Sequence, residues 1–158
     1  MMQRITPFLW FDGQAEDAAR FYTAIFHNSK LGSVRRCGDQ GPGPKGSVMS
    51  VELELDGQSL ISFNGGPQFP FTPAISMFVR CETQDEIDYY WHRLLDGGKP
   101  VQCGWLTDRF GVSWQVVPDA LGEMLQDPDP RRSANVMKAM MQMIKLDLAK
   151  LQAAYEQP

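Results

Sequence analysis

The fold is decided by the stretch Met49-Ser50-Val51-Glu52-Leu53-Glu54-Leu55-Asp56-Gly57-Gln58-Ser59-Leu60-Ile61-Ser62-Phe63-Asn64. Apolar residues alternate with polar ones up to Leu55, which is the period of a β-strand. Asp56-Gly57 then supplies a two-residue hairpin turn, and the chain returns as a second strand from Ser59 to Asn64. The sequence therefore predicts an antiparallel hairpin. Both faces of the returning strand carry apolar residues, so the pattern leaves open which face helices cover and which lines a cavity.

A strand, a helix and another strand precede this hairpin. Ile5 to Phe11 is a short apolar run rich in aromatic residues, and it predicts a buried strand. Apolar residues at helical spacing predict a helix from Ala15 to Phe26. A further strand is predicted from Lys30 to Arg36, and the Gly- and Pro-rich stretch from Gly38 to Gly46 predicts a mobile loop. These elements and the hairpin together form a βαβββ module.

The same order of elements begins again near Ile75. A strand is predicted up to Cys81 and a helix from Thr83 to Leu95, with Thr83 and Glu86 as a capping box. Short strands are predicted within 101–107 and 112–117. The strand–helix units stand about 70 residues apart and the later hairpins about 54, so the second copy is about 16 residues shorter, and we expect much of this difference to be the counterpart of the Gly-rich loop. We therefore predict two modules, residues 1–67 and 74–118.

A helical extension is predicted over residues 119–158. Asp129 as N-cap and Pro130 at the first helical position begin one helix, and a second helical segment runs from Leu146 to Tyr155. The first helix carries a methionine-rich apolar stripe, which indicates core or interface packing rather than a lipid or cofactor site. This stripe is more apolar than one small domain can bury, so we predict a homodimer.

The composition excludes several classes of partner. The net charge is −4 and the basic residues are scattered, so no nucleic-acid partner is expected. No apolar run is long enough for a signal peptide or a membrane span, which predicts a cytoplasmic protein without a membrane partner. The three cysteines are an odd number without CxxC spacing, so we expect free thiols rather than disulfides or a structural zinc site.

The chain resembles the vicinal-oxygen-chelate superfamily of glyoxalases, bleomycin resistance proteins and dioxygenases. More narrowly it resembles the PhnB-like branch, whose domain is also labelled 3-demethylubiquinone-9 3-methyltransferase. The resemblance implies an α+β fold of paired βαβββ modules with C-terminal helices. It spans nearly the whole chain and rests on short motifs that arrive in order: Thr6-Pro7-Phe8-Leu9-Trp10-Phe11, Phe21-Tyr22-Thr23, Asn64-Gly65-Gly66-Pro67, Tyr89-Tyr90-Trp91, Cys103-Gly104-Trp105, Asp108-x-x-Gly111-Val112-Ser113-Trp114-Gln115-Val116-Val117-Pro118 and Met143-x-Lys145-x-Asp147.

The resemblance also supplies a test for a metal site. In metal-dependent members of the superfamily, four side chains on the first and last strands of the two modules hold a divalent ion. These positions fall on Ile5 or Pro7, on Leu60 or Ile61, on Ser76 and on Gln115. Only Gln115 is of the ligand type, and one amide and one hydroxyl cannot hold a hard divalent ion. We predict neither a metal site nor a cofactor.

The methyltransferase label can be tested in the same way. A methyltransferase of the doubly wound type needs a Gly-rich turn between its first strand and helix, whereas Phe11-Asp12-Gly13-Gln14 holds one glycine. The sequence therefore does not support that activity.

A small molecule bound in an apolar cavity is the partner that the sequence predicts. Gln115 lies on an otherwise apolar strand, so its amide needs either a ligand or neighbouring backbone as a hydrogen-bond partner. Cys103 either lines the cavity or is an inert buried thiol. His27 and His92 are predicted to face solvent, so no catalytic residue is assigned. The candidate ligand-binding residues are Gln115, Ser76, Asn64, Trp10, Cys103 and Trp105.

Three functions are compatible with these residues. The first is binding of a small, partly apolar molecule, or catalysis on it, without a metal ion. The second is a metal-dependent lyase, isomerase or dioxygenase whose ligands the motifs do not reveal. The third is a dimeric scaffold without a small ligand. The substrate, and whether the chain is an enzyme, stay open at this point.

Overall fold

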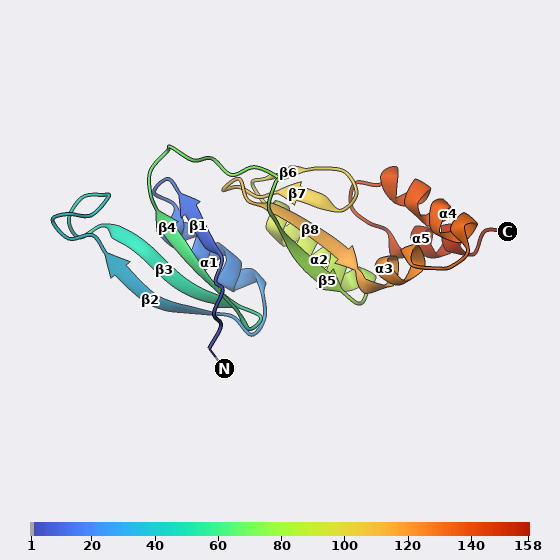
Figure 1. Ribbon diagram of the computed structural model, residues 1–158, viewed down its shortest axis with the longest axis horizontal. Coiled ribbons are helices and arrows are strands. Elements are labelled where there is room, and N and C mark those ends of the chain that lie inside the picture. Colours follow the sequence, from blue (N-terminus) through green and yellow to red (C-terminus); the bar gives the residue numbers. More distant parts are fainter. Residues whose placement is uncertain (1) are drawn as a thin grey trace. The chain divides into compact units, whose positions relative to one another are not determined.

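The computed structural model describes residues 2–158. It shows two four-stranded sheets, and helices follow the second sheet at the C-terminal end of the chain (Figure 1). The chain divides into two compact units, Met1–Phe71 and Thr72–Pro158, which are described one at a time. No helix among residues 2–158 is both long enough and apolar enough to cross a membrane.

The first unit contains one βαβββ module. Its elements are β1 (Phe8–Phe11), α1 (Ala15–Ile25), β2 (Lys30–Arg36), β3 (Val48–Leu55) and β4 (Gln58–Asn64). The sheet has the order β1-β4-β3-β2; β1 and β4 run parallel, and the other neighbours are antiparallel. The predicted hairpin is confirmed as β3 and β4, joined at Asp56-Gly57, where both residues have a positive φ.

The second unit repeats this module. Its elements are β5 (Ser76–Cys81), α2 (Gln84–Leu95), β6 (Lys99–Pro100), β7 (Trp105–Thr107) and β8 (Ser113–Pro118). The order β5-β8-β7-β6, with β5 and β8 parallel, matches the first sheet strand for strand. The predicted pair of modules is therefore confirmed, with α1 and α2 in equivalent places. As expected, only residues 101–104 join β6 to β7 where the first module has its Gly-rich loop between β2 and β3. The strands are shorter as well, since β6 has 2 residues against 7 in β2, and β7 has 3 against 8 in β3.

The packing of α1 settles which face of the returning strand is covered. Leu60 is 1% exposed and Ser62 is 1% exposed, and the Ser62 hydroxyl donates a hydrogen bond of 2.7 Å to the carbonyl of Ala15 in α1. These residues therefore face the helix. Ile61 and Phe63 alternate with them and lie on the open face of the sheet.

The N-termini of α1 and α2 are stabilised in two different ways. The side chain of Thr83 accepts a hydrogen bond from the backbone N–H of Glu86 at 3.2 Å, which confirms the predicted N-cap of α2. The Glu86 carboxylate accepts from the N–H of Glu82 at 3.0 Å, one residue earlier than in a standard capping box. The N-cap residue of α1 makes no side-chain cap bond, and the N–H of Ala15 instead donates to Asn64 Oδ1 at 2.8 Å.

Three helices follow β8 (Figure 1). α4 (Pro130–Met141) begins after the predicted N-cap Asp129, and α5 (Leu148–Tyr155) begins two residues later than the predicted segment, after the N-cap Asp147. α3 (Asp119–Leu125) was not predicted, since it is short and no side chain caps its start. The helices enclose a small core of Val117, Leu121, Met124, Val136, Leu146 and Leu151.

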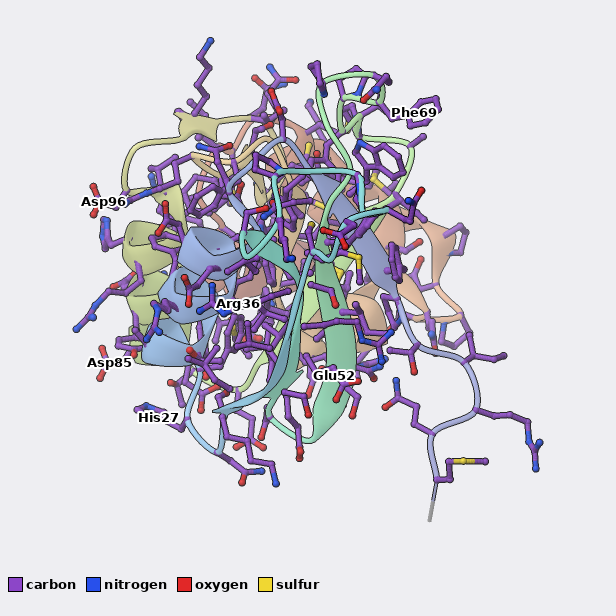
Figure 2. All side chains as sticks on the ribbon, turned by 90° about the vertical axis from the view of Figure 1, so that its left-hand side faces the viewer. His27, Arg36, Glu52, Phe69, Asp85 and Asp96 are labelled. Carbon is purple, nitrogen blue, oxygen red and sulfur yellow. The ribbon has the colours of Figure 1, made fainter. Side chains whose placement is uncertain are left out.

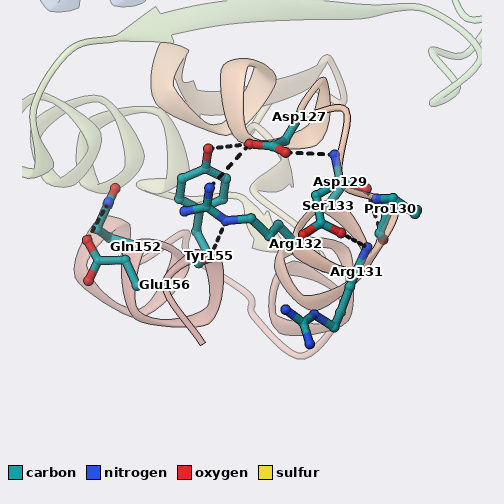
Figure 3. A network of polar contacts seen from close by, with 9 residues as sticks. All are labelled: Asp127, Asp129, Pro130, Arg131, Arg132, Ser133, Gln152, Tyr155 and Glu156. Carbon is teal, nitrogen blue, oxygen red and sulfur yellow. Dashed lines mark hydrogen bonds and ion pairs between the residues drawn. The ribbon is translucent and has the colours of Figure 1, made fainter. Parts of the chain in front are cut away.

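A polar network ties the extension together (Figure 3). The Tyr155 hydroxyl donates to Asp127 Oδ2 at 2.5 Å, and the Arg132 guanidinium lies 3.9 Å from the centre of the Tyr155 ring and 3.7 Å from Asp127 Oδ2. The hydrogen bond from Tyr155 is the main reason why the pKa of Asp127 is lowered, and the same bond raises the pKa of Tyr155. α5 is thereby fixed to the start of α4.

The extension is also fixed to the second module. The backbone N–H groups of Cys103 and Gly104 donate to the carbonyls of Met143 and Ile144, each at 2.8 Å. The Gln84 side chain donates to the carbonyl of Leu146 at 3.1 Å and accepts from the N–H of Leu148 at 2.7 Å. Lys145 pairs with Asp88 at 2.7 Å, and this contact lowers the pKa of Asp88. The C-terminal extension therefore packs as part of the second unit.

Candidate functional site

The open face of the second sheet carries a row of three side chains. Trp114 and Val116 on β8 are buried on the face toward α2, so Gln115 lies on the opposite face. Its register partners are Phe78 on β5 and Trp105 on β7. The strand pairing thus places a single amide between two aromatic side chains from segments far apart in the sequence.

The Gln115 amide has one partner within the chain. Its Nε2 donates to the hydroxyl of Ser76 at 2.9 Å, so two of the predicted residues are in direct contact. Among the described residues, no group donates to Gln115 Oε1. Nε2 and Oε1 are interchangeable by rotation of the amide, so in either orientation one polar end is left for another partner. The Gln115–Ser76 pair can therefore both donate to and accept from a ligand.

An apolar hollow of about 290 Å³ opens beside this row, and we refer to it as the Gln115 pocket. Most of its wall is apolar, and a salt bridge of 3.5 Å between Arg80 and Asp119 contributes the charged groups. Apolar walls with a few polar groups are typical of sites for small molecules. The lining residues are Phe78, Arg80, Cys103, Trp105, Gln115, Val117, Pro118, Asp119, Leu121, Gly122, Leu125 and Met140.

The Cys103 thiol faces the pocket from a tight turn. Cys103 and Gly104 both have a positive φ, 61° and 83°, and the Cys103 Sγ lies 3.9 Å from the Sδ of Met141. All three cysteines are free thiols, as predicted. Burial, together with nearby Glu86 and Asp119, raises the pKa of Cys81 to about 12, so that thiol stays protonated. Cys103 is the one cysteine that lines the Gln115 pocket.

Two predicted ligand-binding residues, Trp10 and Asn64, belong to the first unit and do not line the Gln115 pocket. The Trp10 indole donates to the carbonyl of Gly66 at 2.9 Å and packs edge-on against Phe63 and Phe69. Asn64 accepts from Ala15 and donates to the carbonyl of Val48 at 3.0 Å. Both side chains therefore hold local structure of the first module.

The strand register identifies the four positions that the resemblance assigns to metal ligands. Phe8 pairs with Ile61 and Phe78 pairs with Gln115, so Ile61, not Leu60, is the counterpart of Gln115. By the same register the counterpart of Ser76 is Thr6, in place of Ile5 or Pro7. Two hydroxyls, one amide and one alkyl group do not fit a divalent ion.

The potential metal ligands elsewhere in residues 2–158 are dispersed. In that range no three His, Cys, Asp or Glu side chains lie close enough together to hold a metal ion. His27 and His92 are exposed, as predicted, and His27 lies at the outside of the first unit (Figure 2). The histidines therefore contribute nothing to the pocket.

Sequence reasoning missed the far wall of the pocket. Leu121, Leu125 and Met140 come from α3 and α4, and their apolar spacing is also that of ordinary core residues. Phe78 could have been found from the repeat, since it stands 70 residues after Phe8 and pairs with Gln115 as Phe8 pairs with Ile61.

Asp108 belongs to the motif before the last strand, but the motif does not show that its side chain is buried. It is 3% exposed and accepts from two backbone N–H groups and from the Trp114 indole at 2.8 Å.

Comparison with known proteins identifies relatives of this fold. The family model described as 3-demethylubiquinone-9 3-methyltransferase matches residues 3–117. The PhnB protein of Bacillus cereus, provisionally described as a 3-demethylubiquinone-9 3-methyltransferase, is 39% identical, with a TM-score of 0.67 over 73% of this chain and 99% of its own. Protein PA1353 of Pseudomonas aeruginosa is 23% identical, with a TM-score of 0.62 over 74% of this chain and 98% of its own, a likeness of fold. No curated protein matches the chain.

The family match covers both modules and ends at the last residues of β8. The topology of the two modules, the identity to the Bacillus cereus protein and the extent of the match agree. The chain belongs to the 3-demethylubiquinone-9 3-methyltransferase family, the PhnB-like branch of the vicinal-oxygen-chelate superfamily.

Proposed function

We propose that the chain binds a small, partly apolar molecule in the Gln115 pocket and that it does so without a metal ion. The observation that carries the proposal is the placement of Gln115 between Phe78 and Trp105, with one end of its amide unpaired, beside an apolar hollow. A flat ring can lie against the aromatic side chains while its polar edge bonds to the amide. Ser76 does not line the pocket itself, and its hydroxyl holds the Gln115 amide in place through the hydrogen bond of 2.9 Å.

The chemistry of the donors supports binding without a metal. The positions that correspond to metal ligands carry Thr6, Ile61, Ser76 and Gln115, and a Lewis acid needs several stronger ligands. The family name also implies a methyl transfer. We do not extend that activity to this chain, since two mixed sheets and a single glycine after β1 lack the nucleotide-binding turn of the doubly wound methyltransferases.

We further propose that the chain forms a homodimer. Met137, Met141 and Ile144 are 43%, 52% and 54% exposed, and they form an apolar stripe along and just after α4. Contact with a second copy would remove this stripe from water. Sedimentation at micromolar concentration should give about twice the chain mass of 17.8 kDa. A monomer under these conditions would contradict the dimer.

The binding proposal is tested by a screen of small aromatic fragments, followed by NMR on the labelled protein. We expect fragments to shift the Trp105 indole signal. Gln115→Ala should weaken their binding by roughly 5- to 150-fold, which corresponds to the about 1 to 3 kcal/mol typical of an unpaired buried polar partner. Ile61→Ala is the matched control, because it changes the equivalent position of the first module, and it should leave binding unchanged.

Metal titration of the same proteins tests the absence of a metal. Nickel, zinc, manganese and iron should bind no more tightly to the wild type than to Gln115→Ala. Micromolar binding that is lost in Gln115→Ala would favour the metal-dependent alternative. A screen without a single fragment bound near Trp105 would favour a scaffold without a small ligand.

A further inference from the structure

We infer that the C-terminal extension decides which molecules the Gln115 pocket accepts, by selecting those that carry an aliphatic chain beyond the polar group held at Gln115. This inference rests on the proposed function and specifies its ligand class. It assigns a role to residues 118–158, which lie beyond the match to the family model.

The lining of the pocket divides at the end of the family match. Phe78, Trp105 and Gln115 belong to the module, and the match ends at Val117. The Bacillus cereus structure is covered over 99% of its length by 73% of this chain, so it offers no counterpart to the remaining quarter of the chain. The residues of the lining that lie beyond the match are Pro118, Asp119, Leu121, Gly122, Leu125 and Met140.

The extension is held firmly enough to serve as a preformed wall. Leu121 and Val117 share the core of the C-terminal helices with Leu146. Gly104 lies so close to Leu146 that a Cβ at Gly104 would be 3.0 Å from its side chain. Together with the backbone bonds from Cys103 and Gly104, this packing fixes α3 and α4 against the module. A rigid wall loses little entropy when a ligand binds, so its shape can select among ligands.

The two halves of the lining differ in chemistry, and this difference defines the ligand class. The module contributes aromatic surface and the amide, which suit a flat head with hydrogen-bonding groups. The extension contributes the aliphatic side chains of Leu121, Leu125 and Met140, which suit an alkyl chain. We therefore expect an aromatic amide or a group of similar hydrogen-bonding pattern, extended by a short alkyl chain.

Gly122 is an exposed residue of α3 that borders the pocket and leaves open space beside it. A Cβ at Gly122 would meet no atom within 4 Å, although the residue lies within α3 and lines the pocket. A leucine there would fit the folded protein and favour the helix, while occupying the pocket. Glu123→Leu is the matched control, since it adds the same side chain to an exposed position of α3 outside the pocket lining.

The experiment measures the affinity of benzamide, 4-ethylbenzamide and 4-butylbenzamide for the full chain by NMR titration. In the wild type each buried methylene or methyl group should tighten binding about fourfold, so the butyl compound, with four more carbons, should bind roughly 250-fold more tightly than benzamide. Gly122→Leu should remove this dependence on chain length and Glu123→Leu should keep it. Gln115→Ala should weaken every member of the series by a similar factor.

The outcomes separate this inference from the proposed function. Binding that depends on Gln115 but does not change with chain length or with Gly122→Leu would overturn the role of the extension and leave the proposed function standing. Failure of all three compounds to bind at millimolar concentration, while other aromatic fragments still shift the Trp105 indole signal, would overturn the inferred ligand class and leave the proposed function standing.

Discussion

The two modules share one strand order and differ on the face of the sheet that no helix of the module covers. In the first module the row across β1, β4 and β3 is Phe8, Ile61 and Glu52. In the second module the equivalent row is Phe78, Gln115 and Trp105. Two substitutions therefore turn a row with a single aromatic side chain and a carboxylate into an amide between two aromatic rings.

The hollows on the two open faces differ accordingly. The one on the first module includes the side chains of Gln3, Lys30, Glu52 and Glu54, whereas the Gln115 pocket is closed on one side by α3 and α4. The duplicated backbone therefore fixes where a face is open. The side chains on that face and the element added after β8 make it a candidate binding site.

The largest difference that we predict between the modules concerns their turns. The Asp108 carboxylate accepts three hydrogen bonds just before β8. Without it, the backbone N–H groups of Phe110 and Val112 and the indole N–H of Trp114 would lose this partner. Asp108→Ala should lower the free energy of unfolding by about 3 kcal/mol or more. Asp56→Asn, in the exposed turn of the first module, should change it by less than about 0.5 kcal/mol. Urea unfolding of both variants measures the difference, and equal effects would contradict it.

A smaller effect is expected where the first module has its own tight contact. A Cβ at Gly65 would lie 2.3 Å from the Trp10 ring, so Gly65→Ala should lower the free energy of unfolding by about 1 to 3 kcal/mol through overpacking. Gly122→Ala has open space and a helical backbone, and should raise it by up to about 1 kcal/mol. Thermal unfolding of the two variants should therefore shift in opposite directions. A Gly65→Ala variant that unfolds at the same temperature as the wild type, or at a higher one, would contradict the predicted clash with Trp10.

The smallest effect concerns acid and is confined to the second unit. The pKa of Asp127 is lowered, chiefly by the hydrogen bond from Tyr155, so its stabilising contribution is present above the ordinary carboxyl range and is lost as the pH falls through the lowered value. Hydrogen exchange should show α4 and α5 losing protection in this acid range before α1. In Tyr155→Phe this dependence should shrink, and an unchanged acid profile would contradict the role of the pair.

The same pair predicts a second limit at high pH. The pKa of Tyr155 is raised, so its contribution is present below the ordinary tyrosine range and is lost as the pH rises through the raised value. The extension should therefore be best protected between the two limits. Ultraviolet titration of Tyr155, compared with Tyr155→Phe, checks this upper limit.

Most of the helices and strands, and their repetition, follow from local patterns in the amino-acid sequence, whereas α3 does not. The alternation in β3, the Asp56-Gly57 turn, and the N-caps Thr83 and Asp129 are set by neighbours within a few residues, where local geometry decides the structure. The repeat follows because two copies of the same local pattern fold in the same way. The family motifs identified Gln115, although the sequence left its surroundings open.

Tertiary structure alone decided what surrounds Gln115. Strand register brings Phe78, Trp105 and Ser76 to it from segments far apart in the chain, and a shift by one residue would turn all these side chains to the other face. The wall from α3 and α4 depends on packing, because apolar helical spacing looks the same in a core and in a pocket. Asn64 shows the same dependence on tertiary structure, since its Oδ1 accepts a hydrogen bond from Ala15 at the start of α1, 49 residues away in the sequence.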